Sequence, residues 1–204
     1  MTEIIDKYYT IKEHFSSEIK ISKSVFISNI FSVDSKEKIK ENLSLIRKKI
    51  NNAHHHPYAY RLGLDENNFK ANDYGEPSGS SGKPILEVID KYELTNVMLI
   101  VSRIFGGVKL GIGGLKRAYF ESAESCVVKE NIITKYLTEF ITAEFDYKYI
   151  NQFMNYLEKH NIKILENNSD EAVRLKFEMR LSFIDNIKKD LTNLTNGSLK
   201  FITY

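Results

Sequence analysis

The spacing of hydrophobic and polar residues in the first part of the chain predicts strands followed by a helix. Residues 19–33 alternate polar side chains with β-branched or aromatic ones, which is typical of a strand or a hairpin. Residues 35–52 instead carry a helical repeat with a charged opposite face, and Asp34 or Ser35 is the expected N-cap. The apolar positions of that repeat are Ile39, Leu43, Ile46 and Ile50.

The middle of the chain continues this alternation of strands and helices. Residues 58–64 alternate and predict a strand, with 69–70 near the end of the turn that follows it. A helix is expected to begin in 84–89, because proline favours the first helical turn. The continuous apolar run 96–105 predicts a strand buried on both faces, and 114–129 reads as a long helix.

The last third of the chain has its own pattern of elements. Strands are expected at 139–146, 163–167, 173–179 and 198–203, and helices at 147–160 and 182–194, the first with Ile150, Phe153, Met154 and Leu157 inward. The resulting order βαββαβ is that of the split-βαβ, ferredoxin-like arrangement. We therefore expect an α+β protein with a domain at 1–137 and a smaller one at 138–204.

Composition fits a folded, cytoplasmic protein. The 204 residues are 42% hydrophobic, with twelve Phe and twelve Tyr, which is ample for a packed core. The single cysteine, Cys126, fits a reducing compartment and is expected to be a core residue rather than a nucleophile. No signal peptide and no apolar run long enough to span a membrane is found in the sequence.

Glycine is concentrated in two short segments. Three of the ten glycines lie in DYGEPSGSSGKPIL, residues 73–86, and five in VSRIFGGVKLGIGGLKRAY, residues 101–119. Glycine weakens helices and strands unless the backbone needs a positive φ or another group approaches it closely. The two segments therefore specify a particular backbone geometry.

The second glycine segment has the order strand, glycine loop, helix. Residues 101–120 contain four cations and no acidic residue, and the first amides of a helix favour an anion. The spacing matches neither a P-loop nor a Rossmann fingerprint, and the alternative is that the glycines only permit a tight turn. The candidate anion- or nucleic-acid-binding residues are Arg103, Gly106, Gly107, Lys109, Gly111, Gly113, Gly114, Lys116 and Arg117.

The first glycine segment holds two carboxylates, Asp73 and Glu76. At this spacing they are weak candidates for acid and base or for divalent-cation ligands, and the alternative is turn chemistry. With a neighbouring histidine, the segment is expected to form an exposed loop surface. That surface consists of His55, Asp73, Gly75, Glu76, Pro77, Ser78 and Gly79.

A run of three histidines precedes the strand at 58–64. In an extended chain His54 and His56 share a face and could begin a zinc site, with Asp73 or Glu76 as further ligands. The alternative is a polar end to the preceding helix. We favour this alternative and expect neither a metal nor a cofactor.

Three ordered motifs together resemble the IMPACT/YigZ family: AHHHPYAYRLG from residue 53 and the two glycine segments. The resemblance covers most of residues 15–130, and the second domain matches the C-terminal half of bacterial members. The chain departs from the family pattern at Tyr74, Ser80-Ser81, Ile104 and His56-Pro57.

The resemblance implies a first domain like the second domain of a small-subunit ribosomal protein and like a domain of elongation factor G. It implies a second domain like another elongation factor G domain. Eukaryotic relatives regulate translation during amino-acid starvation by competing for an activator of a stress kinase. We therefore expect a non-enzymatic protein that binds RNA or the ribosome, with a protein partner in translation control as a further expectation. The alternatives are an enzyme acting on a small anionic substrate and a protein-interaction module.

Overall fold

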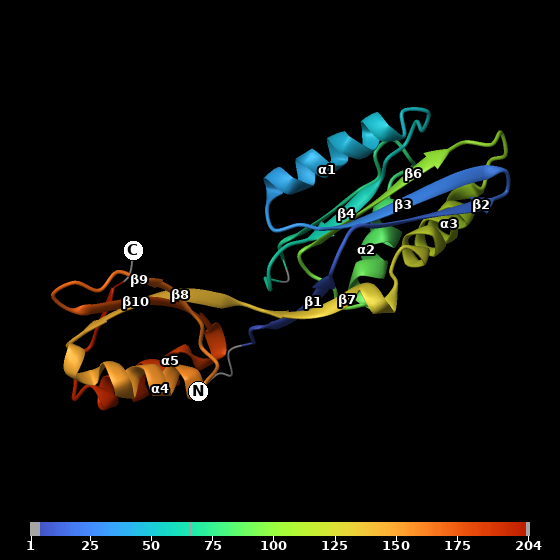
Figure 1. Cartoon of the computed structure of the whole chain (residues 1–204). Helices are drawn as coiled ribbons and strands as arrows, with labels where there is room; N and C mark the ends of the chain where they lie inside the picture. Colours follow the sequence, from blue (N-terminus) through green and yellow to red (C-terminus); the bar gives the residue numbers. More distant parts are fainter. Residues whose placement is uncertain (1–4, 66, 203–204) are drawn as a thin grey trace. The chain divides into compact units, whose positions relative to one another are not determined.

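The computed structural model describes residues 5–65 and 67–202 (Figure 1). The chain divides into two units, each with its own core. One unit spans Tyr8–Lys135, and the other joins residues 136–202 to the described residues before Tyr8. Within the described ranges, no helix is both long and apolar enough to cross a bilayer.

The first unit is built on a five-stranded antiparallel sheet with the order β2-β3-β6-β4-β5. Its strands are β2 (Phe15–Ile21), β3 (Ser24–Ser32), β4 (Tyr58–Arg61), β5 (Phe69–Asn72) and β6 (Val97–Ile104). Of the strand or hairpin predicted for residues 19–33, the structure shows the hairpin, because β2 and β3 pair across a tight turn. Residues 69–70, expected near the end of a turn, instead begin the edge strand β5, because backbone pairing to β4 holds this short polar segment extended.

Helices cover both faces of this sheet (Figure 1). Helix α1 (Lys36–Lys49) packs on one face, while α2 (Gly82–Lys91) and α3 (Gly111–Ser125) pack on the other. In β6, Leu99 belongs to the core under α2 and α3, and its neighbours Met98 and Ile100 belong to the core under α1. This alternation confirms the strand buried on both faces.

The start of α1 follows local capping chemistry, and that of α3 does not. The Ser35 side chain accepts a hydrogen bond from the Lys38 amide at 3.3 Å and so caps α1, as predicted. Helix α3 begins three residues earlier than expected, so its glycines lie in the first turn rather than before it. It is followed by the short helix η1 (Lys129–Asn131) and by β7 (Ile132–Tyr136), which pairs with β1 (Lys7–Ile11).

The second unit confirms the predicted βαββαβ order. Its elements are β8 (Thr138–Phe145), η2 (Tyr147–Tyr149), α4 (Ile150–Lys159), β9 (Ile164–Asn167), β10 (Val173–Arg180), η3 (Leu181–Phe183), α5 (Ile184–Leu194) and β11 (Lys200–Ile202). The antiparallel sheet has the order β11-β8-β10-β9, and both helices cover the same face (Figure 1). Position 203, the predicted end of the last strand, lies outside the described residues.

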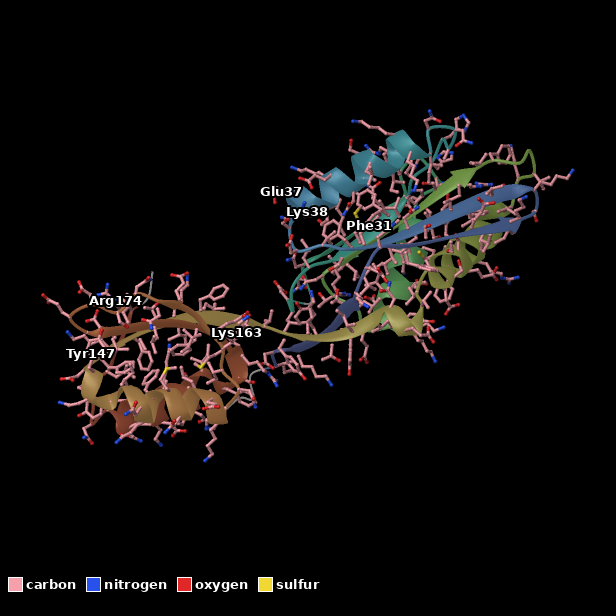
Figure 2. All side chains as sticks on the ribbon, viewed as in Figure 1. Phe31, Glu37, Lys38, Tyr147, Lys163 and Arg174 are labelled. Atoms are coloured by element: carbon pink, nitrogen blue, oxygen red, sulfur yellow. The ribbon has the colours of Figure 1, made fainter. Side chains whose placement is uncertain are left out.

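Aromatic side chains form the centre of the second core. The Phe153 ring stacks on Phe145 with centroids 4.1 Å apart and lies tilted against Phe177. Side chains fill the space between sheet and helices, and the labelled Arg174 lies on the sheet strands away from that space (Figure 2). Met154, expected to face inward, is exposed, because it is one residue beyond Phe153 on the helix and points away from the sheet.

Candidate functional site

The two glycine segments meet in space and line one cavity. Its volume is about 380 Å³, and its walls include Glu76 and Pro77 from the first segment and Arg103 and Lys109 from the second. His55 lies at the same cavity. We call this space the glycine-segment cavity.

Two of the glycines are required by close backbone approaches. A Cβ on Gly106 would lie 1.9 Å from the carbonyl oxygen of Lys23, and one on Gly82 would lie 2.5 Å from the Asn72 nitrogen. The Gly106 amide also donates to Ser24 Oγ at 3.3 Å. These positions explain why the segments need glycine where other residues would collide with the β2–β3 turn or with β5.

Asp73 organises its own loop and the start of α2. Its carboxylate accepts hydrogen bonds from the amides of Gly79, Ser81 and Gly82 and from Ser81 Oγ, at 2.8 to 3.0 Å. Burial opposes ionisation, but these hydrogen bonds outweigh it and hold the pKa of Asp73 below its ordinary value. The Asp73 carboxylate therefore stabilises a turn, which is the alternative to a catalytic role that the sequence left open.

Glu76 is the acceptor of a buried polar cluster. Its Oε1 accepts from Arg103 Nη1 at 2.9 Å and from the Tyr119 hydroxyl at 2.7 Å. Burial, and then the Glu76 carboxylate, raise the pKa of Tyr119 above its ordinary value, so Tyr119 remains a donor. The cluster ties the first glycine loop to β6 and α3.

Arg103 is not the exposed cation that the sequence suggested. Its side chain is only 6% exposed and pairs with Glu76, itself 4% exposed. Its Nη2 lies 3.5 Å from Ser24 Oγ, and its guanidinium lies over the rings of Phe26 and Phe105. A charged residue inside an apolar strand needs such a partner, because burying an unpaired charge is costly.

The remaining predicted cations lie on two sides of the first turns of α3. Lys109 lines the glycine-segment cavity. Lys116 and Arg117 instead line a groove of about 510 Å³ between α2 and α3, together with Lys83. We call Lys83, Lys116 and Arg117 the basic groove end.

Lys83 was not among the predicted site residues. It belongs to the other glycine segment and stands alone there as a cation, so only its place in the first turn of α2 could have pointed to it. The groove also contains Glu87, Glu121 and Glu124, which lie further along the two helices. Among the described residues, Lys83, Lys116 and Arg117 form no ion pair, whereas Glu124 pairs with Lys91.

The N-terminus of α3 is open. Among the residues that the structure describes, no side chain caps it; its first turn holds no acidic residue, and Gly111 has a φ of +69°. A Cβ on Gly107, Gly111 or Gly113 would meet nothing within 4 Å, and one on Gly114 would touch only Leu110 at 3.1 Å. The predicted glycine loop therefore faces free space around the helix start.

The rest of the predicted loop surface is largely exposed. Gly75, Pro77 and Ser78 are exposed, and Gly79 is half-buried with its amide bonded to Asp73. His55 Nδ1 lies 3.3 Å from the Tyr74 carbonyl oxygen.

The three histidines have separate environments. His54 is exposed, whereas His56 is buried with its Nδ1 2.8 Å from Ser102 Oγ. Burial, and then the positive charge of Arg47, lower the pKa of His56. No group of three or more His, Cys, Asp or Glu able to hold a metal occurs in the part of the chain that the structure describes.

Cys126 is a core residue, as predicted. It is fully buried, and its Sγ donates to the Phe15 carbonyl oxygen at 3.2 Å. Burial raises the pKa of the Cys126 thiol to about 12, so the thiolate is not formed near neutral pH.

Two bacterial relatives match nearly the whole chain. The Bacillus subtilis IMPACT family member YvyE is 34% identical over 194 residues, which cover 95% of this chain and 89% of the relative. The Escherichia coli IMPACT family member YigZ is 27% identical over 186 residues, 90% of this chain and 91% of the relative. A crystal structure of a hypothetical protein shares the fold, with a TM-score of 0.72, 23% identity and 98% of both chains covered.

A eukaryotic relative matches only the first part of the chain. The rabbit Protein IMPACT is 32% identical over 92 residues, 44% of this chain and 29% of that protein. Two family models match the chain. The Impact N-terminal domain matches residues 22–127, and a domain of unknown function, DUF1949, matches residues 144–198. The chain therefore belongs to the IMPACT family.

Proposed function

We propose that this protein is a non-enzymatic binding protein that contacts RNA phosphates, with the ribosome as its target. The observation that carries the proposal is the basic groove end, where Lys83, Lys116 and Arg117 gather near the beginnings of two helices and have no ion-pair partner in the described part of the chain. The link to translation rests on the family resemblance.

The positive ends of the helix dipoles add to the side-chain charge at the basic groove end. Neither α2 nor α3 has an acidic residue in its first turn, so nothing there opposes the positive end of the helix dipole. The amides at the start of α2 are already used by Asp73, whereas α3 has no capping side chain. The α3 end is therefore the better position for a phosphate.

The acidic residues of the groove limit how many RNA phosphates it can contact. Glu87, Glu121 and Glu124 would repel phosphates further along the helices, so the footprint is a few phosphates at one end. Side-chain ammonium and guanidinium groups bind the backbone without reading bases. We expect binding that depends on salt and shape rather than on base sequence.

Catalysis is not part of the proposal, because both candidate carboxylates are committed to structural contacts. Asp73 accepts four hydrogen bonds from its own loop and from the start of α2. Glu76 is paired with Arg103 and Tyr119.

Fluorescence anisotropy with a labelled hairpin RNA over a salt series tests this proposal. The unaltered protein should bind at low salt, and Lys83→Ala/Lys116→Ala/Arg117→Ala should reduce the slope of log K against log salt by about three. The matched control is Lys40→Ala/Lys48→Ala/Lys49→Ala, which removes the same charge from exposed positions on α1, across the sheet. Absence of binding at low salt, or an equal loss in both variants, would overturn the proposal.

A further inference from the structure

The glycine-segment cavity combines cationic donors with an apolar wall. Its polar side consists of Arg103, Lys109, Glu76, His55 and the first residue of α3, Gly111. The apolar side consists of Pro77, Phe105, Leu110, Ile112 and Leu115. The phosphate proposal shares only the start of α3 with this cavity, so the remaining lining residues require their own explanation.

Arg103 brings an unused donor to this cavity. One of its terminal nitrogens bonds Glu76, and the other lies 3.5 Å from Ser24 Oγ. Its Nε is buried and has no hydrogen-bond partner among the described residues. A buried donor without an acceptor is costly, so an acceptor that reaches Arg103 Nε from the cavity would gain from it.

The charge of the cavity favours an anionic acceptor. The Glu76 carboxylate is matched by Arg103, which leaves the ammonium of Lys109 in excess. The uncapped start of α3 at Gly111 adds further donors of the same polarity. A carboxylate satisfies both the charge and the missing acceptor.

The apolar wall favours a ligand with an apolar part. Phe105 and Ile112 line the cavity and are 46% and 60% exposed. Large apolar side chains at the mouth of a cavity mark a place where an apolar group binds. The volume of about 380 Å³ lies in the range of small-ligand pockets.

We propose that the glycine-segment cavity binds a carboxylate that carries an apolar side chain. Lys109, the free Nε–H of Arg103 and the first turn of α3 hold the carboxylate, while Phe105 and Ile112 contact the apolar group. A peptide C-terminus that ends in a residue such as leucine and a free apolar acid share this chemistry.

Titration of the full chain by NMR with N-acetyl-leucine and N-acetyl-leucinamide tests the proposal. The acid should bind and the amide should not, because only the acid carries the negative charge. Lys109→Met and Ile112→Ser, both at exposed positions, should each weaken binding of the acid about tenfold. The control Lys83→Ala/Lys116→Ala/Arg117→Ala, at the basic groove end, should leave it unchanged.

A tetrapeptide that ends in leucine distinguishes the two possible sources of the carboxylate, a peptide C-terminus and a free apolar acid. Tighter binding of the peptide than of N-acetyl-leucine identifies a peptide C-terminus, and equal or weaker binding identifies a free acid; either supports the shared chemistry. Absence of binding by both acids, or equal binding of acid and amide, overturns the proposal. RNA binding is measured with different variants, so the two proposals fail independently.

Discussion

At the scale of single residues, the Glu76–Arg103 pair holds the first glycine loop on β6. Both side chains are almost completely buried, and Tyr119 completes the coordination of the Glu76 carboxylate. Removing one partner of such a pair is costly because the other charge stays buried without compensation. This pair therefore fixes the geometry of the glycine-segment cavity.

Glu76→Gln should lower the free energy of unfolding by about 3–5 kcal/mol, because the Arg103 charge loses its counter-ion. Urea unfolding of the first unit measures the change. The control is Glu87→Gln, at an exposed position of α2, which should change stability by less than about 0.5 kcal/mol. Equal stability of the two variants would show that the pair is not the anchor we describe.

Gly106→Ala should destabilise the protein by about 1–3 kcal/mol or more, because its Cβ would collide with the Lys23 carbonyl. Gly113→Ala is the matched comparison, since its Cβ meets nothing and alanine favours a helix. We expect this second variant to be neutral or slightly stabilised in thermal melts. A larger loss at Gly113 than at Gly106 would contradict the close approach.

For single residues, the sequence predicted where the backbone needs glycine, but it did not predict which groups the polar side chains of these segments contact. Glycine clustering marked both segments, yet nothing in the spacing showed that Asp73 would be saturated by amides of its own loop. Arg103 was expected on the surface although it lies in an apolar strand, and that position was itself a signal for a buried pair. Long-range pairing of this kind depends on tertiary contacts, which one sequence does not reveal.

At the scale of elements, the β2–β3 hairpin sets the position of the second glycine segment. Its turn residues Ser22 and Lys23 have φ of 46° and 67°, the left-handed pattern of a type I′ turn. Neither residue is glycine or asparagine, so the turn carries strain that better turn residues would remove.

Ser22→Asn/Lys23→Gly should raise the free energy of unfolding by about 1 kcal/mol, because Asn-Gly favours this turn. A higher melting temperature by calorimetry is the expected result. The single variant Lys23→Ala serves as a control, since it shortens the side chain without changing the preference for positive φ. A lower melting temperature for the Asn-Gly variant would contradict the turn assignment.

The type and position of an element were predicted well where its hydrophobic pattern is strong, and poorly where that pattern is weak. The helix α1 carries a long helical repeat and the strand β6 a continuous apolar run, and each of these patterns favours one kind of element. The strand β5 has the sequence FKAN, too short and polar to show a period, and pairing with β4 decides its conformation. The start of α3 was placed late because glycine normally disfavours helix, although here it lies in an open first turn.

At the scale of the whole molecule, residue 6 belongs with the second unit although it is far away in sequence. Asp6 is buried, pairs with Arg180 at 2.9 Å and accepts from the Ser182 amide at 2.9 Å. The hydrogen bond from Arg180, followed by those from Ser182, lowers the pKa of Asp6 from 3.8 to about 2, against the effect of burial. The contact therefore fastens the N-terminal segment to the second unit.

Because its folded-state pKa is lowered, Asp6 contributes stability above about pH 4 that is lost as the pH falls towards 2. Asp6→Asn should cost about 1–2 kcal/mol at pH 6, a figure reduced for the partial exposure of Arg180. Urea unfolding at pH 6 and pH 2.5 compares the variant with the unaltered protein. A difference that persists undiminished at pH 2.5 would contradict this linkage.

We propose that the basic groove end brings this IMPACT family protein to the ribosome. Co-sedimentation of the full chain with purified ribosomes over a salt series tests this proposal. Salt-sensitive co-sedimentation that is lost in Lys83→Ala/Lys116→Ala/Arg117→Ala and kept in Lys40→Ala/Lys48→Ala/Lys49→Ala is the result we predict. No co-sedimentation at low salt, or equal co-sedimentation of all three proteins, would contradict it.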